Sequence, residues 1–152
     1  MIIDATDLIV GRFVSTVAKR VMLGEKIDVI NCEKAVISGS RGDIIARFKH
    51  KRRRTTPAKG PFIHRMPDRF MRRIIRGMLP YKKEKGRNAF ENVMCYIGVP
   101  PQFEGKKFET VEEANVATRK TTKFITVADL CQEMGAKLWL RLFTYLERER
   151  KQ

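Results

Sequence analysis

The residues with the most obvious capacity for chemistry in this sequence are cations, and they concentrate in one central block. Residues 47–87 hold sixteen lysines and arginines but only two acidic residues, whereas residues 1–46 and 88–152 are almost balanced. Nearly all of the net charge of +15 therefore comes from this block. Guanidinium and ammonium groups bind phosphates through charge and hydrogen bonds. The block predicts a surface that binds a polyanion.

The clearest helical pattern in the basic block is in PDRFMRRIIRGMLP, residues 67–80. Pro67 suits the first position of a helix and Asp68 its first turn, so we expect a helix over residues 67–78. On this helix an apolar stripe contains Phe70, Met71, Ile74, Ile75 and Met78. A second stripe contains Arg69, Arg72, Arg73 and Arg76. A solvated face normally mixes Glu with Lys, so we expect the apolar stripe to pack on the domain and the arginine stripe to face a polyanion.

Two other basic runs flank this helix. KHKRRR, residues 49–54, is a weak motif by itself, since it is typical of both import signals and plain basic patches. It precedes TTPAKGPFIHRMP, which has three prolines and one glycine and predicts an irregular loop. We interpret the run and the loop together as an arm that follows a phosphate backbone. Phe62 and His64 could equally stack on bases or pack against the domain.

Signals for catalysis are weak. No G-x-G-x-x-G follows the first strand, and no phosphate-binding G-x-x-x-x-G-K-[ST] occurs anywhere. Ser38 lacks a G-x-S-x-G elbow, and the RGD at residues 41–43 lies where Asp43 has an ordinary capping role. We therefore expect no enzyme activity, no catalytic residue and no cofactor.

The cysteines and histidines do not form a metal-binding pattern. Cys32, Cys95 and Cys131 are widely separated, and neither His50 nor His64 has a cysteine at zinc-ligand spacing. This pattern is typical of reduced thiols in the cytosol. The sequence has no apolar run long enough to cross a membrane and begins without signal-peptide features, so we expect a cytoplasmic protein.

The elements that position the basic block predict an α/β domain. Strands are expected at residues 1–5, 27–31, 35–39 and 93–99, and helices at residues 10–22, from Ser40 onward, around Ala89, and from Thr126 onward. A strand–helix–strand succession implies a right-handed crossover and a parallel sheet. The polar and mixed-charge residues 102–123 predict a long segment on the surface of the domain. The apolar and then charged segment 137–152 predicts a terminal helix that docks through Trp139, Leu142, Phe143 and Leu146.

Several segments in order also resemble a known family. They are DATDLIVGRFVSTVAKRV, VINCEKAVISG, HKRRRTTPAKGPFIHRMPDR and RGMLPYKKEKGRNAFENVMCYIGVPP. Together they resemble the L-thirteen family of large-subunit ribosomal proteins, in its archaeal and eukaryotic branch. The likeness runs from Asp4 to about Pro101 and is loose beyond it.

This resemblance implies a three-layer α/β/α domain with a small, mostly parallel sheet, to which the sequence patterns above add a basic loop or arm and a C-terminal helical extension. We expect the domain to span residues 1–135 and the tail residues 136–152. The implied function is structural: binding of folded large-subunit ribosomal RNA beside neighbouring ribosomal proteins, as a monomer within the subunit. The RNA-binding positions carried over from the family are Lys49, Lys51, Arg52, Arg53, Arg54, Lys59, Arg65, Arg69, Arg72, Arg73, Arg76, Lys82, Lys83, Lys85 and Arg87.

Two other classes of function remain open at this stage. The same basic block could serve a regulator that binds mRNA or DNA away from the ribosome. An α/β enzyme acting on nucleotides is a weaker alternative, because the phosphate-binding motifs are missing.

Overall fold

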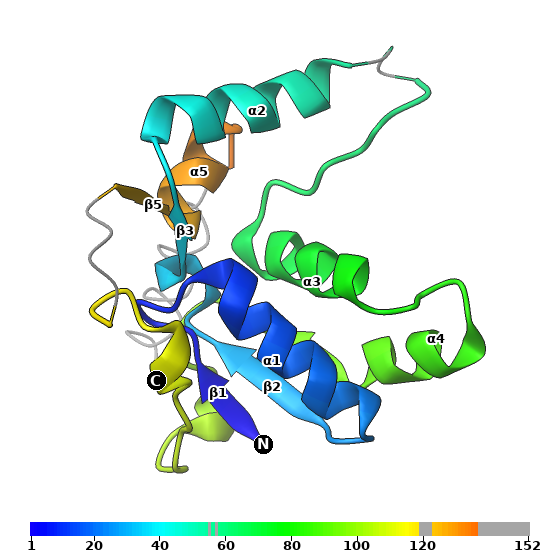
Figure 1. Cartoon of the computed structure of the whole chain (residues 1–152), viewed down its shortest axis with the longest axis vertical. Helices are drawn as coiled ribbons and strands as arrows, with labels where there is room; N and C mark the ends of the chain where they lie inside the picture. Colours follow the sequence, from blue (N-terminus) through cyan, green and yellow to red (C-terminus); the bar gives the residue numbers. More distant parts are fainter. Residues whose placement is uncertain (55, 57, 119–122, 137–152) are drawn as a thin grey trace, which may run out of the picture.

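The computed structural model describes residues 1–54, 56, 58–118 and 123–136 (Figure 1). Its strands are short, and its longest helices have thirteen residues. The strands are β1 (Ile2–Asp4), β2 (Ile27–Ile30), β3 (Val36–Ser38), β4 (Val93–Cys95) and β5 (Phe124–Thr126). The helices are α1 (Val10–Met22), α2 (Arg41–Arg53), α3 (Pro67–Met78), α4 (Glu84–Glu91) and α5 (Val127–Glu133). The predicted tail helix, at residues 137–152, lies outside the described residues.

The central sheet is parallel, with strand order β1-β2-β4. Ile3 pairs with Val29, and Ile27 pairs with Val93, and all four side chains are fully buried. Both connections run in the same direction across the sheet, so right-handed crossovers bring their helices to this apolar face. Met94 on the opposite face is 41% exposed. The core therefore lies on the helix-covered side of the sheet.

Helices α1 and α3 pack against each other over the core. Apolar residues recur along α1 at helical spacing, and its buried residues are Val10, Phe13, Val14, Val17, Ala18 and Val21. All of them except Ala18, at 7% exposure, are nearly or completely inaccessible to solvent. The predicted bounds of α1 and α3 match those of the structure. Strong apolar periodicity thus identified both helices that cover the sheet.

Strand β3 differs from its predicted role, because it does not extend the parallel sheet. It pairs antiparallel with β5, a strand that the sequence did not predict. Residues Phe124–Thr126 form β5, and Thr126 also caps α5 by accepting a hydrogen bond from the Asp129 backbone N–H at 3.1 Å. The expected start of α5 at Thr126 is therefore confirmed.

Helix α2 continues through most of the KHKRRR run, so the helical part of the predicted arm ends at Arg53 and only the segment after it is irregular. Lys49, Lys51, Arg52 and Arg53 all lie in the helix. Lysine and arginine are good helix formers, and cations are favourable near a helix C-terminus. Only Ile44 of α2 is buried, so polar contacts must supply much of its attachment. The loop from residue 58 to residue 66 is irregular, as predicted.

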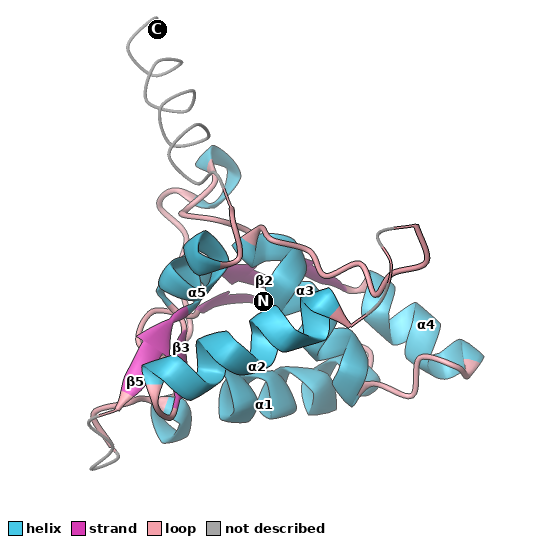
Figure 2. Ribbon diagram, turned by 90° about the horizontal axis from the view of Figure 1, so that it is seen from above, coloured by secondary structure: helices cyan, strands magenta, loops and turns pink. Residues whose placement is uncertain are grey.

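The prediction of an α/β domain with a small, mostly parallel sheet is confirmed. Figures 1 and 2 both place the loop after α2, together with α4, on the side of the molecule opposite β3 and β5. This arrangement gathers segments of the basic block that are separate in the sequence.

Candidate nucleic-acid interface

The apolar stripe of α3 attaches this helix to the core. Phe70, Met71 and Ile75 are at most 2% exposed, and the Phe70 ring packs against Phe48 of α2 with centroids 5.4 Å apart. Ile74 is half-buried. Met78, which the helical spacing assigned to the same stripe, is 44% exposed. The packing of the apolar stripe on the domain, predicted from the sequence, is therefore confirmed at Phe70, Met71 and Ile75 but is wrong at Met78, the last residue of α3.

The arginine stripe of α3 divides into two pairs. Arg69 and Arg76 are exposed, whereas Arg72 and Arg73 are half-buried. The Arg72 guanidinium lies over the Phe90 ring, 4.6 Å from its centroid, and its buried Nε has no hydrogen-bond partner. Arg73 donates a hydrogen bond to the Phe62 carbonyl. No carboxylate in the described part of the chain pairs with any of these four arginines.

The turn after α3 joins the arginine stripe to α4 through aromatic rings. Arg76 lies over Tyr81 at 5.2 Å, and Tyr81 meets Phe90 edge to face at 5.6 Å. The Arg72 guanidinium in turn lies over the Phe90 ring. A cation over a ring face is attracted by the ring quadrupole. The two rings therefore hold the guanidinium groups of Arg72 and Arg76 beside the lysines of the turn. Lys82 and Lys83 are exposed in this turn, and Lys85 and Arg87 are exposed in the first turn of α4.

Gly86 makes this turn possible, because α4 approaches the backbone of Pro80 too closely for a side chain. A Cβ at residue 86 would lie 2.2 Å from the Pro80 carbonyl oxygen and 2.4 Å from its carbon. Both contacts involve backbone, which cannot move aside by a rotamer change. The glycine therefore fixes the position of α4 against the end of α3.

We expect Gly86→Ala to destabilise the fold by about 1–3 kcal/mol, the usual cost of an overpacked site. Thermal unfolding measures the loss, and hydrogen exchange should show it concentrated in α4. Gly77→Ala is the matched control, since a Cβ there meets no atom within 4 Å. Alanine in a helix interior stabilises by roughly 0.5–1 kcal/mol relative to glycine. Equal effects of the two substitutions would contradict this account of Gly86.

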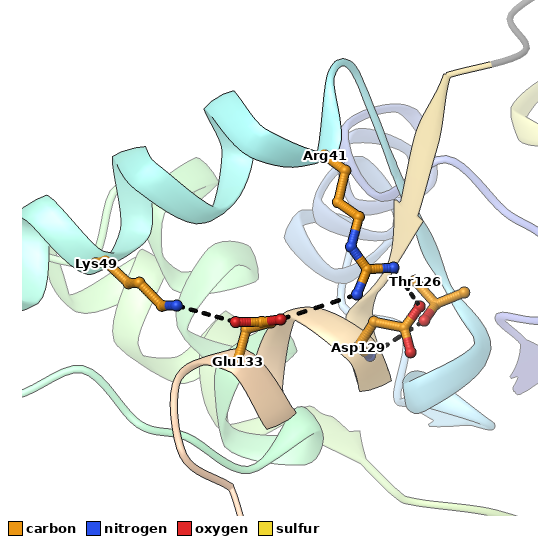
Figure 3. Close-up of polar contacts among 5 residues, drawn as sticks. All are labelled: Arg41, Lys49, Thr126, Asp129 and Glu133. Carbon is orange, nitrogen blue, oxygen red and sulfur yellow. Dashed lines mark hydrogen bonds and ion pairs between the residues drawn. The ribbon is translucent and has the colours of Figure 1, made fainter.

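The first and middle turns of α2 are held by acidic residues of α5 (Figure 3). Lys49 Nζ lies 2.9 Å from Glu133 Oε2, and Arg41 reaches Glu133 at 3.9 Å and Asp129 at 3.8 Å. Lys49, and to a smaller extent Arg41, lowers the pKa of Glu133 below its ordinary value. Arg52 adds a hydrogen bond to the Met134 carbonyl at 2.6 Å. These polar contacts attach a helix that has little apolar surface.

The fifteen predicted cations therefore fall into three structural groups. Five of them contact their own protein through a carboxylate, a carbonyl or an aromatic ring without being fully buried: Lys49, Arg52, Arg65, Arg72 and Arg73. Lys51 and Arg76 lie over aromatic rings but remain exposed. The other eight are exposed, and their side chains form no ion pair or hydrogen bond with any residue that the structure describes: Arg53, Arg54, Lys59, Arg69, Lys82, Lys83, Lys85 and Arg87.

Arg47 is a further exposed cation of α2 that the candidate set left out. Its guanidinium lies 5.4 Å from the Phe48 ring centroid, and it belongs to the same basic block. Arg47 could have been identified because it is one of the sixteen basic residues counted in residues 47–87. It was left out because the KHKRRR run begins at residue 49.

The described residues form neither a metal-binding cluster nor a membrane-spanning helix. No group of three His, Cys, Asp or Glu side chains lies close enough together to hold a metal ion within residues 1–54, 56, 58–118 and 123–136. None of the helices in the same ranges has the length and hydrophobicity needed to span a bilayer. Cys32, Cys95 and Cys131 are free, and burial raises the pKa of Cys131 to about 12.

Known proteins similar to this chain share most of its length. The family described as "Ribosomal protein L13" matches residues 1–102. The protein named "Large ribosomal subunit protein uL13" of Methanosarcina barkeri is 41% identical over 137 residues, covering 90% of this chain and 98% of its own. Its namesake in Methanocaldococcus jannaschii is 44% identical over 140 residues, again covering 90% and 98%.

A third relative of the same name, from Archaeoglobus fulgidus, is 41% identical over 135 residues, which cover 88% of this chain and 86% of the relative. The similarity to these three archaeal proteins thus extends well beyond Pro101, where the resemblance seen in the sequence became loose. It must include part of the region that forms β5 and α5. This chain belongs to the ribosomal protein L13 family.

Proposed function

We propose that this protein is a non-catalytic, structural constituent of the large ribosomal subunit. It binds folded ribosomal RNA of that subunit and supports subunit assembly and translation in the cytoplasm. The observation that carries the proposal is the membership of the chain in a ribosomal protein family over most of its length. The basic block supports it, because its cations lie on a folded α/β frame and mostly lack acidic partners among the described residues.

The proposed mechanism is electrostatic. Lysines and arginines of α2, the following loop, α3 and α4 neutralise RNA phosphates and release the counterions that surround them. Folded RNA brings phosphates of different strands close together, and cations fixed on one surface offset their repulsion. Double-stranded RNA presents mainly its shape, phosphates and 2′-hydroxyls, so most contacts should go to the backbone. With on the order of 6–10 phosphates engaged, affinity should fall by orders of magnitude between low and moderate salt.

We assign the phosphate contacts to the fifteen cations predicted from the sequence. These cations differ in how accessible their side chains are to RNA. The exposed ones, such as Arg53, Arg69 and Lys82, are available directly. Those with an internal contact, such as Lys49 and Arg52, keep further donors, because an ammonium group has three and a guanidinium five. We also propose that residues 1–135 form the RNA-binding domain and that residues 136–152 form a separate tail.

Sedimentation of cell lysate on a sucrose gradient tests the proposed function. We expect the protein to sediment as a monomer within large subunits, in stoichiometric amounts beside neighbouring ribosomal proteins. A protein that stays at the top of the gradient would contradict the proposal. Competition adds a second comparison: fragments of large-subunit ribosomal RNA should displace duplex DNA from the purified chain. Displacement in the opposite direction would favour a DNA-binding regulator.

A further inference from the structure

The C-terminal half of α2, the loop after it and Glu133 of α5 line a cavity of about 620 Å³ that is open to solvent. This volume lies within the range of pockets that bind small ligands. The cavity is lined by four cations and by an aromatic ring, together with one carboxylate. The cations are Lys49, Arg52, Arg53 and Arg65, the ring belongs to Phe62, and the carboxylate to Glu133. Such a lining combines the two groups that recognise a nucleotide: charge for its phosphates and a flat apolar face for its base.

The charge of this cavity is not balanced by its own residues. Glu133 is the lining acid, and it already pairs with Lys49 at 2.9 Å and with Arg41 at 3.9 Å. Arg52 and Arg65 both point their Nη1 atoms at the end of α5, where they lie 3.9 Å and 3.5 Å from the position of a Cβ on Gly135. Two guanidinium groups brought this close repel each other. An anion placed between them would relieve that repulsion.

Backbone carbonyls hold both of these arginines in place. Arg52 donates to the Met134 carbonyl at 2.6 Å, and Arg65 donates to the Gly135 carbonyl at 3.5 Å. A guanidinium has five N–H donors in a rigid fork, so each arginine keeps donors for a phosphate. The carbonyls at the end of α5 carry the partial negative charge of a helix C-terminus, which helps to position the cations without neutralising them.

The Phe62 ring is exposed, but contacts with its own loop fix its position. It is 69% accessible to solvent, and two of its ring carbons would lie 3.2 Å from a Cβ at Gly60. The ring therefore packs closely on the glycine backbone, where no larger residue would fit. The Phe62 carbonyl accepts a hydrogen bond from Arg73, which ties the same residue to α3. One edge of the ring thus lies against its own loop, and most of the ring is exposed to solvent.

We propose that this cavity binds one unstacked nucleotide of the ribosomal RNA. The base stacks on the Phe62 ring, and the adjacent phosphates lie between Arg52, Arg53 and Arg65. Unpaired nucleotides in RNA are commonly recognised by stacking on aromatic side chains. This inference rests on the proposed function and adds to it a contact that is not phosphate binding alone. It selects the base-stacking alternative for Phe62 that the sequence left open.

Substitution of Phe62 by alanine tests the inference on the full chain, with a large-subunit ribosomal RNA transcript as the probe. We expect Phe62→Ala to lower the affinity roughly 5- to 150-fold, the usual range for one base stacked on an aromatic residue. The salt dependence should stay unchanged, because no charge is removed. The Phe62 carbonyl remains, so the contact with Arg73 is kept. Phe108→Ala is the matched control, since Phe108 is an exposed phenylalanine, 39% accessible, that does not line the cavity.

Chemical probing of the RNA bases supplies a second measurement. One unpaired base should be protected by the wild-type protein and by Phe108→Ala, and become reactive with Phe62→Ala. Equal affinity and equal protection with Phe62→Ala would overturn the inference while leaving the proposed function in place. Loss of a neighbouring protein from subunits, with RNA affinity unchanged, would also overturn it. If the wild-type chain itself fails to bind the transcript, the proposed function fails as well.

Discussion

Replacement of Arg69, Arg72, Arg73 and Arg76 by glutamate is expected to abolish stable binding to large-subunit ribosomal RNA. The variant lowers the net charge of the chain from +15 by eight units, and it does so on one face of one helix. Each phosphate contact that is lost should reduce the salt dependence of binding by about one unit. With up to four contacts replaced by repulsion, we expect the affinity at moderate salt to fall by more than about 100-fold.

The fold should survive this change with reduced stability. Arg72 and Arg73 lose contacts to Phe90 and to the Phe62 carbonyl, and a cation over an aromatic ring contributes about 0.5–1 kcal/mol at exposed sites. Circular dichroism measures whether the helices persist. The double variant Arg69→Glu/Arg76→Glu separates the two effects, because both of these side chains are exposed and the contact that is lost is the one between Arg76 and the Tyr81 ring. It should weaken RNA binding at a cost to stability of no more than about 1 kcal/mol.

A matched control places the same change of charge elsewhere. Lys19, Lys26, Lys107 and Lys123 are exposed lysines outside residues 47–87, and their replacement by glutamate also removes eight units of charge. If the net charge of the chain alone governed binding, both quadruple variants would lose affinity equally. If the basic block governs it, the control should retain most of its affinity. Retained, salt-resistant binding by the α3 variant would refute the role assigned to the arginine stripe.

The second large effect concerns the apolar side of the same helix. Phe70→Ala should destabilise the protein by about 3–5 kcal/mol, the usual cost of truncating a buried phenylalanine. Phe70 is 2% exposed and contacts Phe48, so the substitution leaves a cavity between α3 and α2. A domain of this kind has only about 5–15 kcal/mol of stability in total. Denaturant unfolding measured by circular dichroism should therefore show a large shift of the midpoint.

Met78→Ala is the control for Phe70→Ala. Met78 has the helical spacing of the apolar stripe but is 44% exposed, so its truncation should change stability by no more than about 0.5 kcal/mol. Similar losses for the two variants would mean that the Met78 side chain itself packs against the core, contrary to its exposure in the structure. RNA binding by folded Phe70→Ala at low temperature should remain close to that of the wild type.

Local sequence patterns were sufficient for the elements with strong periodicity. The bounds of α1 and α3 follow from apolar spacing and from Pro67 at a helix start. The pairing of β3 with β5 could not be inferred in this way. Val36 pairs with Thr126, ninety positions away, and each strand has only three residues. So short a segment does not encode its partner.

The sequence predicted which segment carries the excess positive charge, but not how its side chains are arranged in space. Charge counting located residues 47–87, yet the length of α2 depends on contacts with distant residues such as Glu133 and Met134. In the same way, only the folded structure distinguishes Arg72, which covers Phe90, from the exposed Arg69. The tertiary contacts decide which cations are free for a ligand and which also hold the protein together.

Ultraviolet cross-linking of the protein within assembled large subunits tests the central claim most directly. The RNA-bound peptides can be identified by mass spectrometry after nuclease and protease digestion. If the basic face binds ribosomal RNA, the cross-linked peptides should come mainly from residues 47–87, in α2, the loop after it, α3 and α4. Cross-links confined to residues 1–46 and 88–135 would contradict that claim.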